Sequence, residues 1–137
     1  MLLDYVKKLE YKSDSERLQT IKKILNPNKI GFTEQKYNLK IFEGTNLIVD
    51  VGNLKSKKHI ILSAHFDVVS GSPGANDDAS AIAILIDVIK KLRKLKLKNK
   101  VRIIFFDDEE IGRFGSISYI KKYGLKDLLA VYHLELC

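Results

Sequence analysis

Residues 59–110 read HIILSAHFDVVSGSPGANDDASAIAILIDVIKKLRKLKLKNKVRIIFFDDEE. Two apolar runs of strand length, His59–Ala64 and Val101–Phe106, lie on either side of a loop and a helix. The loop is predicted over Phe66–Asn76 and the helix over Asp78–Leu95. Helical spacing places five apolar side chains on one face of that helix: Ile82, Leu85, Ile86, Ile89 and Leu92. The pattern predicts a strand, a covering helix and a second strand.

The same alternation continues toward the C-terminus. A helix is predicted over Gly115–Tyr123, ended by Gly124, and a strand over Leu128–Leu136. A chain that alternates strands and helices in this way is typical of a parallel-rich sheet covered by helices. We therefore expect an α/β fold with three layers, in which a mixed, parallel-rich sheet is flanked by helices.

The N-terminal part is predicted to combine helices with a hairpin. The expected elements are two helices within Met1–Leu25, broken near Tyr11–Asp14, and two strands over Tyr37–Phe42 and Asn46–Val51. The strands would be joined at Glu43-Gly44-Thr45. A length of 137 residues fits one domain. We expect a single domain with a helical segment over residues 1–36 and a core over residues 37–137.

The composition excludes several classes of protein. Apolar residues make up 45% of the chain, which excludes wholesale disorder. The longest apolar stretch, around Ile82–Ile89, is too short to span a bilayer. A single cysteine, Cys137, excludes an internal disulfide. The N-terminus lacks the apolar core of a signal peptide, so we expect a cytoplasmic protein without a membrane partner.

The net charge of +7 raises the question of nucleic-acid binding. Lysines and arginines concentrate between Lys90 and Arg102, but such a run at a helix end is usually a solvated face that suits the helix dipole. A phosphate-binding stripe is the alternative. We expect no nucleic-acid partner, because carboxylates cluster elsewhere in this basic chain. Clustered carboxylates repel one another unless a cation lies among them.

The first candidate site residues follow the strand His59–Ala64. His65 can offer a ring nitrogen to a metal while Asp67 holds its other N–H. A lone histidine in a loop more often packs or caps, so this pair alone is a weak signal. Further along, Asp77 is expected to point into the crevice at the strand ends, and Asp77 or Asp78 to cap the following helix. Two capping aspartates would explain that second pair equally well.

Four consecutive carboxylates, Asp107-Asp108-Glu109-Glu110, follow the strand Val101–Phe106. Neighbouring side chains in an extended segment point in different directions, so one glutamate can bind a metal while the next reaches the attacking water. A surface acidic turn is the alternative. Glu135 lies in the last predicted strand, where an unpaired acid is costly, and His133 is expected to share its face.

Together these residues supply carboxylate oxygens and one histidine at the carboxyl ends of neighbouring strands. Ligands bind at such ends in open α/β sheets. The mixture suits Zn²⁺ or another first-row divalent ion. Two ions about 3.5–4 Å apart can share a bridging carboxylate.

These motifs resemble those of the cocatalytic zinc exopeptidases, a family that includes bacterial leucyl aminopeptidases, glutamate carboxypeptidase II and the glutaminyl cyclases. The resemblance covers roughly Tyr37–Cys137. Three motifs carry it in order: Ser63-Ala64-His65-Phe66-Asp67, Pro73-Gly74-Ala75-Asn76-Asp77-Asp78-Ala79-Ser80 and Phe105-Phe106-Asp107-Asp108-Glu109-Glu110-Ile111-Gly112.

The resemblance implies a role for each matching residue. His65, Asp77, Glu110 and Glu135 would bind metal, with Asp77 bridging two zinc ions. Asp67 would orient His65, and Glu109 would be the general base that takes a proton from the attacking water and passes it to the leaving amine. The family usually has aspartate where this chain has Glu135. It also supplies a second histidine ligand downstream, and this sequence has no histidine after Glu135.

The resemblance thus implies a metallo-exopeptidase, of aminopeptidase type, that hydrolyses peptide substrates with two zinc ions or other divalent metals. Family members are considerably longer than this C-terminally short chain, so the alternative is a non-catalytic metal-binding or assembly module of the same fold. Deacylases and carboxypeptidases also stay open, because the residues that select a peptide terminus lie outside this chain. A final strand with an uncovered apolar edge would favour association with a second copy or another chain.

Overall fold

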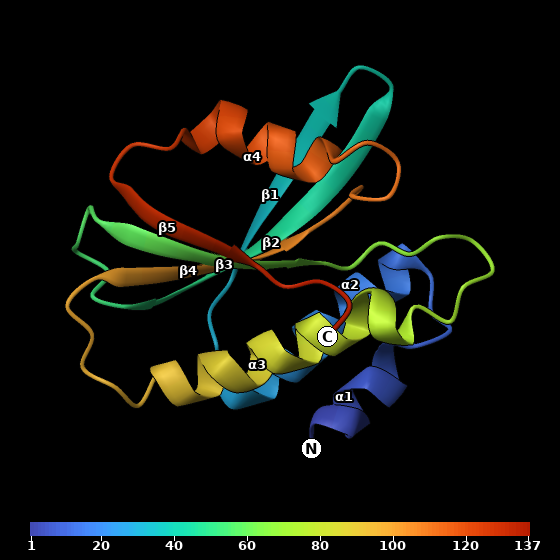
Figure 1. The fold of residues 1–137 in the computed structure, drawn as a ribbon, viewed down its shortest axis with the longest axis horizontal. Helices are drawn as coiled ribbons and strands as arrows, with labels where there is room; N and C mark the ends of the chain where they lie inside the picture. Colours follow the sequence, from blue (N-terminus) through green and yellow to red (C-terminus); the bar gives the residue numbers. More distant parts are fainter.

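The computed structural model describes residues 1–137 and is built around a five-stranded sheet in the order β1-β2-β4-β3-β5 (Figure 1). The strands are β1 (Thr33–Leu39), β2 (Phe42–Gly52), β3 (His59–His65), β4 (Lys100–Phe106) and β5 (Leu128–His133). Strand β3 runs parallel to β4 and β5, whereas the β1–β2 and β2–β4 pairs are antiparallel. The expected α/β fold with a mixed sheet is confirmed.

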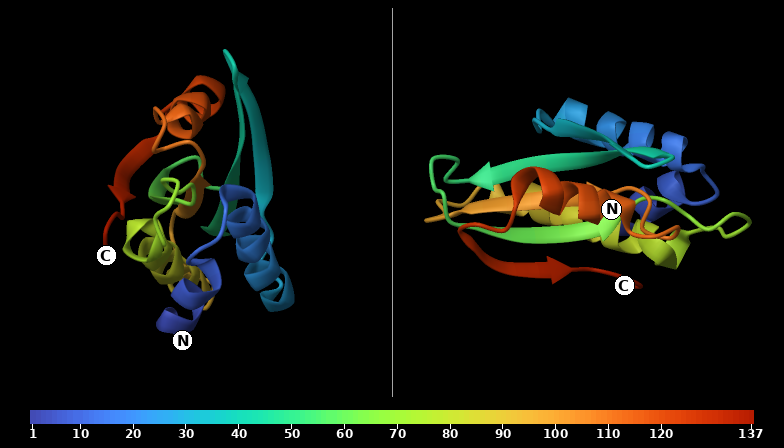
Figure 2. Two further views of the ribbon diagram at one scale, coloured as in Figure 1. Left: turned by 90° about the vertical axis from the view of Figure 1, so that its right-hand side faces the viewer. Right: turned by 90° about the horizontal axis from the view of Figure 1, so that it is seen from above.

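Helices cover both faces of the sheet and complete the three layers (Figures 1 and 2). The helices are α1 (Leu2–Leu9), α2 (Asp14–Leu25) and α3 (Ser80–Leu92) on one face and α4 (Phe114–Tyr123) on the other. A short 3₁₀ turn follows α2, and the irregular turn Ala75–Ala79 precedes α3. None of the helices combines the length and apolar character needed to cross a membrane.

The alternation of side chains along the strands creates two cores. Successive residues of a strand point to opposite faces, so Leu47 and Val49 of β2 pack in the larger core with α1, α2 and α3. Ile48, which lies between them, packs against Tyr119 of α4 in the smaller core. Helix α3 buries the apolar face that its sequence spacing predicts, including Ile82 and Ile86. The ends of β3 and β4 therefore lie between these two cores.

The hairpin turn lies earlier than expected. Strand β1 begins at Thr33, inside the segment expected to be helical, and the turn is Lys40-Ile41 rather than Glu43-Gly44-Thr45. Lys40 adopts a left-handed backbone conformation with φ 61°, which lets Leu39 pair directly with Phe42. Gly44 is a paired residue of β2, and its missing side chain leaves room for the ring of Tyr37.

Neither Asp77 nor Asp78 caps α3, so that expectation was wrong. The helix begins at Ser80 and ends at Leu92, and its N-terminus has no side-chain cap. Asp77 has a non-helical backbone conformation with φ −113° and ψ 94°. The Asp78 carboxylate instead accepts a hydrogen bond of 3.2 Å from the backbone N–H of His65. A tertiary bond to the end of β3 has replaced the expected local cap.

Strand β5 ends at His133, so Glu135 lies beyond the strand rather than inside it. The strand pairs with β3 alone and forms an edge of the sheet. Its side chains Leu129, Val131 and Tyr132 are 50–59% exposed. The association that we expect of such an edge stays a prediction: sedimentation analysis should find assemblies larger than one chain, and a strictly monomeric protein would contradict it.

Candidate metal centre

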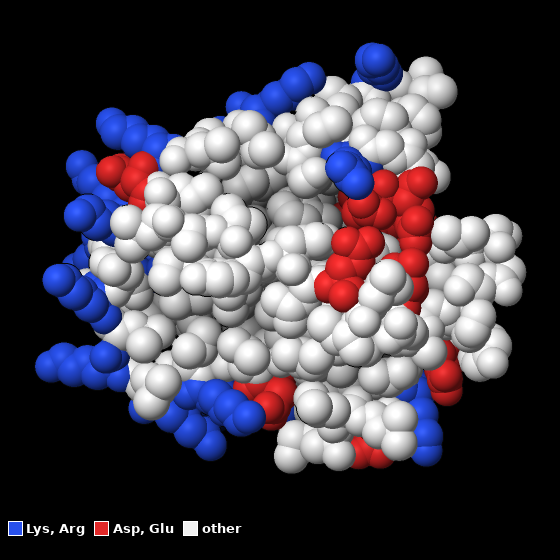
Figure 3. Space-filling view, in the orientation of Figure 1, with Lys and Arg blue, Asp and Glu red and all other residues white.

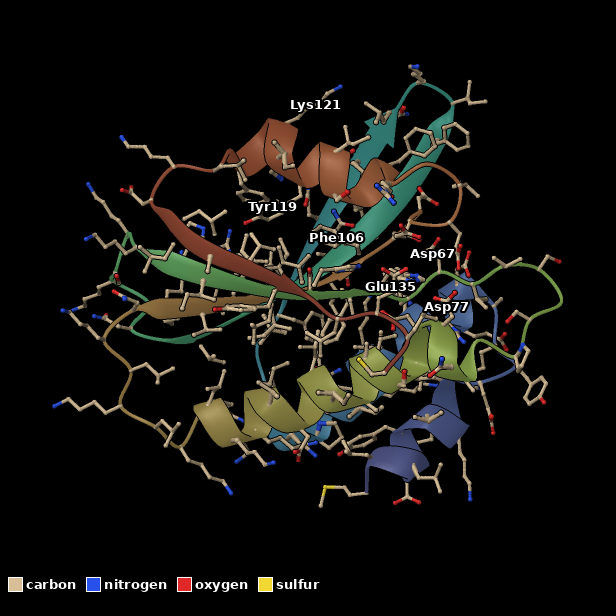
Figure 4. All side chains as sticks on the ribbon, viewed as in Figure 1. Asp67, Asp77, Phe106, Tyr119, Lys121 and Glu135 are labelled. Atoms are coloured by element: carbon tan, nitrogen blue, oxygen red, sulfur yellow. The ribbon has the colours of Figure 1, made fainter.

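Acidic side chains gather where strands β3, β4 and β5 end (Figure 3). Lysine and arginine side chains lie mainly around the opposite edge of the same view. Two groups of possible metal ligands share His65: the first adds Asp77 and Glu110, and the second adds Glu109 and Glu135. Within each group the ligand atoms lie within 4.8 Å of one another. Figure 4 shows Asp67, Asp77 and Glu135 close together at this edge.

His65 is the centre of the arrangement. It is the last residue of β3 and is fully buried. Its Nδ1 lies 3.2 Å from the backbone oxygen of Asp67 and 3.3 Å from the Asp67 carboxylate, while its Nε2 lies 3.0 Å from the Asp77 carboxylate. Both ring nitrogens thus face oxygen acceptors. With one proton kept on Nδ1 by Asp67, Nε2 is the atom that could bind a metal beside Asp77.

The charges around His65 control its titration. Burial lowers the pKa of the imidazole, but the hydrogen bond to Asp67 and the negative charges of Asp78, Asp67 and Asp77 outweigh this effect and raise the pKa to about 9. Without a metal, the ring is therefore a cation surrounded by carboxylates. A divalent cation bound at Nε2 would take over the role of that proton.

Asp67 connects the end of β3 to the segment after β4. It is 3% exposed, and its Oδ2 accepts a hydrogen bond of 2.9 Å from the backbone N–H of Glu110. Burial raises the pKa of this carboxyl, but the hydrogen bonds from His65 and from the backbone N–H groups of Glu110 and Glu109 outweigh it, so the pKa is lowered. Asp67 is thus an ionised group that orients His65 and Glu110 together.

The run Asp107–Glu110 divides into two structural and two site-facing residues. Asp107 accepts the backbone N–H of Thr45 at 2.9 Å, and Asp108 accepts the Tyr37 hydroxyl at 2.7 Å. The chain reverses at Asp108, where φ is 55°, so Glu109 and Glu110 point toward His65. Burial is the main reason why the pKa of Asp107 rises to about 6 and that of Tyr37 rises as well.

The donor set fits a divalent cation. Asp78 is fully buried and its Oδ1 has no hydrogen-bond partner. Burial, above all, raises the pKa of Asp78 to about 7, and burial followed by the charge of Asp77 raises the pKa of Glu110. Burial thus disfavours the charge of these carboxylates, and a bound cation would compensate for the lost solvation. One imidazole nitrogen with several carboxylate oxygens is a ligand set that zinc accepts.

Glu135 reaches the site from beyond β5. The backbone N–H of Leu134 donates to the oxygen of Ser63 at 2.8 Å, which keeps this segment against β3 and brings Glu135 beside His65 and Glu109. His133 joins neither ligand group. Its Nδ1 lies 2.9 Å from the Ser63 hydroxyl, and its Nε2 lies 3.9 Å from the Glu135 carboxylate.

Two supporting residues have no role in the sequence interpretation. Tyr37 binds Asp108, as described above, and the buried amide of Asn46 accepts the backbone N–H of Asp107 at 3.1 Å and donates to the oxygen of Gly115 at 2.8 Å. A polar residue beside the apolar run of β2 was a signal for Asn46. Tyr37 carried no such signal, because an aromatic residue in a strand usually packs.

An apolar groove opens beside Glu109 and Glu135. It has a volume of about 380 Å³ and lies between α4 and β5. Its walls include Phe106 and Tyr119, both labelled in Figure 4, and Glu109 and Glu135 line it as well. The carboxylates are therefore next to a surface that can contact an uncharged part of a ligand.

The chain is similar in sequence to known proteins. The family model described as peptidase family M28 matches residues 46–137. The aminopeptidase YwaD of Bacillus subtilis is 29% identical over 137 residues, which cover 85% of this chain and 30% of that protein.

Two solved structures are similar as well. A zinc aminopeptidase from B. subtilis has a TM-score of 0.65 and 26% identity, covering 72% of this chain and 25% of the other. A glutaminyl cyclase from Porphyromonas gingivalis has a TM-score of 0.78 and 18% identity. The match covers 98% of this chain and 56% of that chain. The chain thus spans less than two thirds of the length of each of these relatives.

Proposed function

The chain belongs to peptidase family M28, and on that premise we propose that it forms the metal-binding core of a zinc-dependent exopeptidase of aminopeptidase type. The observation that carries the proposal is the grouping of four carboxylates, from Asp77, Glu109, Glu110 and Glu135, around the buried ring of His65. The resemblance to curated aminopeptidases supports the choice of reaction.

We infer that His65, Asp77, Glu110 and Glu135 hold two zinc ions, with Asp77 as the bridging ligand. The donor set supports zinc, and the partly exposed carboxylate of Asp77 lies 3.0 Å from Nε2 of His65, the residue that the two ligand groups share. Bound zinc would lower the pKa of a water molecule and polarise the scissile carbonyl. The remaining steps depend on the protein's own side chains.

Glu109 is proposed as the general base. Its carboxylate is 20% exposed and lies at the groove, where its one ion pair, at 3.2 Å, is with the exposed Arg113. Glu109 would take a proton from the attacking water and donate it to the leaving amine. Asp67 would keep the proton of His65 on Nδ1, and the groove would receive an uncharged part of the peptide.

The direct test is metal content followed by hydrolysis. The protein would be loaded with zinc, desalted and measured by elemental analysis, with two ions per chain expected. Hydrolysis of amino-acid 4-nitroanilides should then depend on zinc and disappear after chelation. A chain that retains no zinc would contradict the proposal.

A second candidate is metal binding without hydrolysis, as a binding or assembly module. It is favoured by the ligand groups themselves, which contain a single histidine, His65. Zinc retention combined with no hydrolysis of any amino- or carboxyl-terminal peptide substrate would support this second candidate over the first.

The pH dependence of zinc binding is a further prediction. Because the pKa of His65 is raised from 6.5 to about 9, the metal-free protein holds a proton that zinc must displace at neutral pH. Zinc affinity should rise about tenfold per pH unit for each proton displaced as the pH increases toward about 9, and this dependence on His65 should level off above that value. In the metal-free protein the sign is opposite: a raised pKa stabilises the fold below 6.5, and this contribution is lost as the pH rises through 9.

Calorimetry in buffers of different ionisation enthalpy measures the protons released per zinc ion. His59→Gln is the matched control, because His59 lies at the other end of β3 and bonds the oxygen of Lys57. The control should release the same number of protons as the wild type. Zinc affinity that does not change with pH would contradict the prediction.

A further inference from the structure

The segment Phe66–Asn76 connects two of the proposed ligands, His65 and Asp77, and contains little regular structure. Between Phe66 and Gly74 it forms no helix or strand. Its few backbone bonds include the N–H of Phe66 to the oxygen of Phe106 at 2.9 Å and the N–H of Ser72 to the oxygen of Val69 at 3.0 Å. The position of Asp77 relative to His65 therefore depends on what packs against this segment.

One buried side chain, Arg17 of α2, holds both ends of the segment. Arg17 is 0% exposed. Its Nη1 donates to the oxygen of Phe66 at 3.4 Å, and its Nη2 donates to the oxygens of Gly74 at 2.7 Å and Pro73 at 3.3 Å. Phe66 directly follows His65, and Gly74 shortly precedes Asp77. A single guanidinium thus links the chain after one ligand to the chain before the other.

Two further contacts come from the same part of the chain. The Asp14 carboxylate, at the start of α2, accepts the backbone N–H of Val68 at 2.9 Å. The backbone N–H of Tyr11 donates to the oxygen of Pro73 at 2.9 Å. The junction of α1 and α2 therefore contacts the segment at several points.

Gly74 is matched to Arg17. It has φ +60°, a conformation that favours glycine, and a Cβ at this position would lie 2.0 Å from Nη2 of Arg17. The glycine lets the guanidinium approach the backbone of the segment. A buried guanidinium is costly unless it is well bonded, and here its charge lies near Asp14 and Asp67.

We propose that Arg17 is a positioning residue, which sets the separation of His65 and Asp77 by binding both ends of the segment that joins them. The inference rests on the zinc site proposed above. It also goes beyond the family match, which begins at residue 46 and does not include α2. Arg17 belongs to neither ligand group and acts through the backbone of Phe66–Gly74.

The test compares Arg17→Met, which keeps the length of the side chain, with Arg17→Lys, which keeps its charge. We expect Arg17→Met to weaken zinc binding by about 10- to 100-fold, the range seen when a partner of a metal ligand is removed. The visible absorption of a cobalt-substituted sample should change as well. Arg17→Lys should recover part of the affinity, because one ammonium can bond Gly74 and Pro73 but not reach Phe66 at the same time.

Matched controls separate positioning from loss of stability. Arg93→Met removes another guanidinium that donates to two backbone oxygens, those of Asn28 and Lys29, far from the ligands. Ile21→Val destabilises the buried face of α2 without touching the segment. Both controls should keep wild-type zinc affinity and the wild-type cobalt spectrum.

The outcomes distinguish the two proposals. If Arg17→Met lowers the melting temperature of the metal-free protein but keeps wild-type zinc affinity and cobalt spectrum, Arg17 is merely structural and the inference is overturned. Tighter zinc binding would also overturn it, because that would mean that the charge of Arg17 merely repels the metal. A wild-type chain without zinc affinity would overturn the proposed site itself.

Asp14→Ala is the second variant, for the case in which Arg17→Met does not fold. It removes the acceptor for Val68, and the side chain is only partly buried. We expect a smaller loss of zinc affinity in the folded variant. Wild-type zinc affinity and a wild-type cobalt spectrum in both Asp14→Ala and Arg17→Lys would then overturn the inference, because Arg17→Lys cannot hold Phe66 and Gly74 at the same time.

Discussion

Replacing Glu109 by glutamine is expected to lower the rate of peptide hydrolysis by about 10²- to 10⁴-fold, the range contributed by a general base. Glutamine has the same shape as glutamate but cannot take a proton from water. Zinc content should stay at the wild-type level, because the roles proposed here assign the metal to His65, Asp77, Glu110 and Glu135. The fold should also be kept, since Glu109 is partly exposed and its ion pair is with the exposed Arg113.

The control for this substitution is Glu43→Gln. Glu43 is exposed on the β1–β2 hairpin, where it accepts a hydrogen bond of 2.9 Å from the Asn38 side chain, and its replacement makes the same change of charge. Steady-state hydrolysis and elemental analysis are measured on both variants. If Glu109→Gln lost zinc together with activity, Glu109 would be a ligand rather than the base. Full activity in Glu109→Gln would remove it from the mechanism.

The second large effect is expected from Asp77→Asn. Asp77 faces Nε2 of His65 at 3.0 Å, and its proposed role is to bridge both ions. Loss of this charge should weaken zinc binding by more than the roughly 100-fold that removal of an outer partner can cost. Hydrolysis should disappear with the metal. The fold should tolerate the change, because the Asp77 side chain is 40% exposed.

Asp87→Asn is the matched control for Asp77→Asn. It makes the same substitution on α3, where Asp87 pairs with Lys91 at 2.8 Å on the surface. Chelator competition gives the zinc affinity of both variants, and thermal unfolding without metal gives their stability. Wild-type zinc affinity in Asp77→Asn would exclude a bridging role, even if hydrolysis were lost.

The two substitutions together separate chemistry from metal binding. Glu109→Gln is expected to give a protein that holds zinc without hydrolysis, whereas Asp77→Asn is expected to lose both properties. Loss of zinc in both variants would instead indicate that Glu109 and Glu135, which form one of the ligand groups around His65, hold the metal together.

Much of the fold was predictable from local pattern. The helix spacing of Ile82, Leu85 and Ile86 and the apolar run Val101–Phe106 depend on residues that are neighbours in the chain, and both elements form as expected. The order of strands and helices then predicted that His65 and the acidic run would share one end of the sheet. The structure places them there.

Element ends were less predictable, because tertiary contacts compete with local signals. Asp78 resembles a helix cap in the sequence, yet its carboxylate bonds the backbone of His65. Gly44 resembles a turn residue, yet it accommodates Tyr37 inside a strand pair. In both cases a contact with a residue distant in sequence replaces the role that the local pattern suggested.

The sequence by itself determined the order of the elements, the α/β class and the supply of one histidine and several carboxylates at the strand ends. Those properties follow from short-range periodicity and from residue chemistry. Only the tertiary structure decided that Asp107 and Asp108 bond the β1–β2 hairpin while Glu109 and Glu110 face His65, and that Arg17 is buried against the segment between the ligands. Such contacts join residues far apart in the chain, and packing of the layers brings them together.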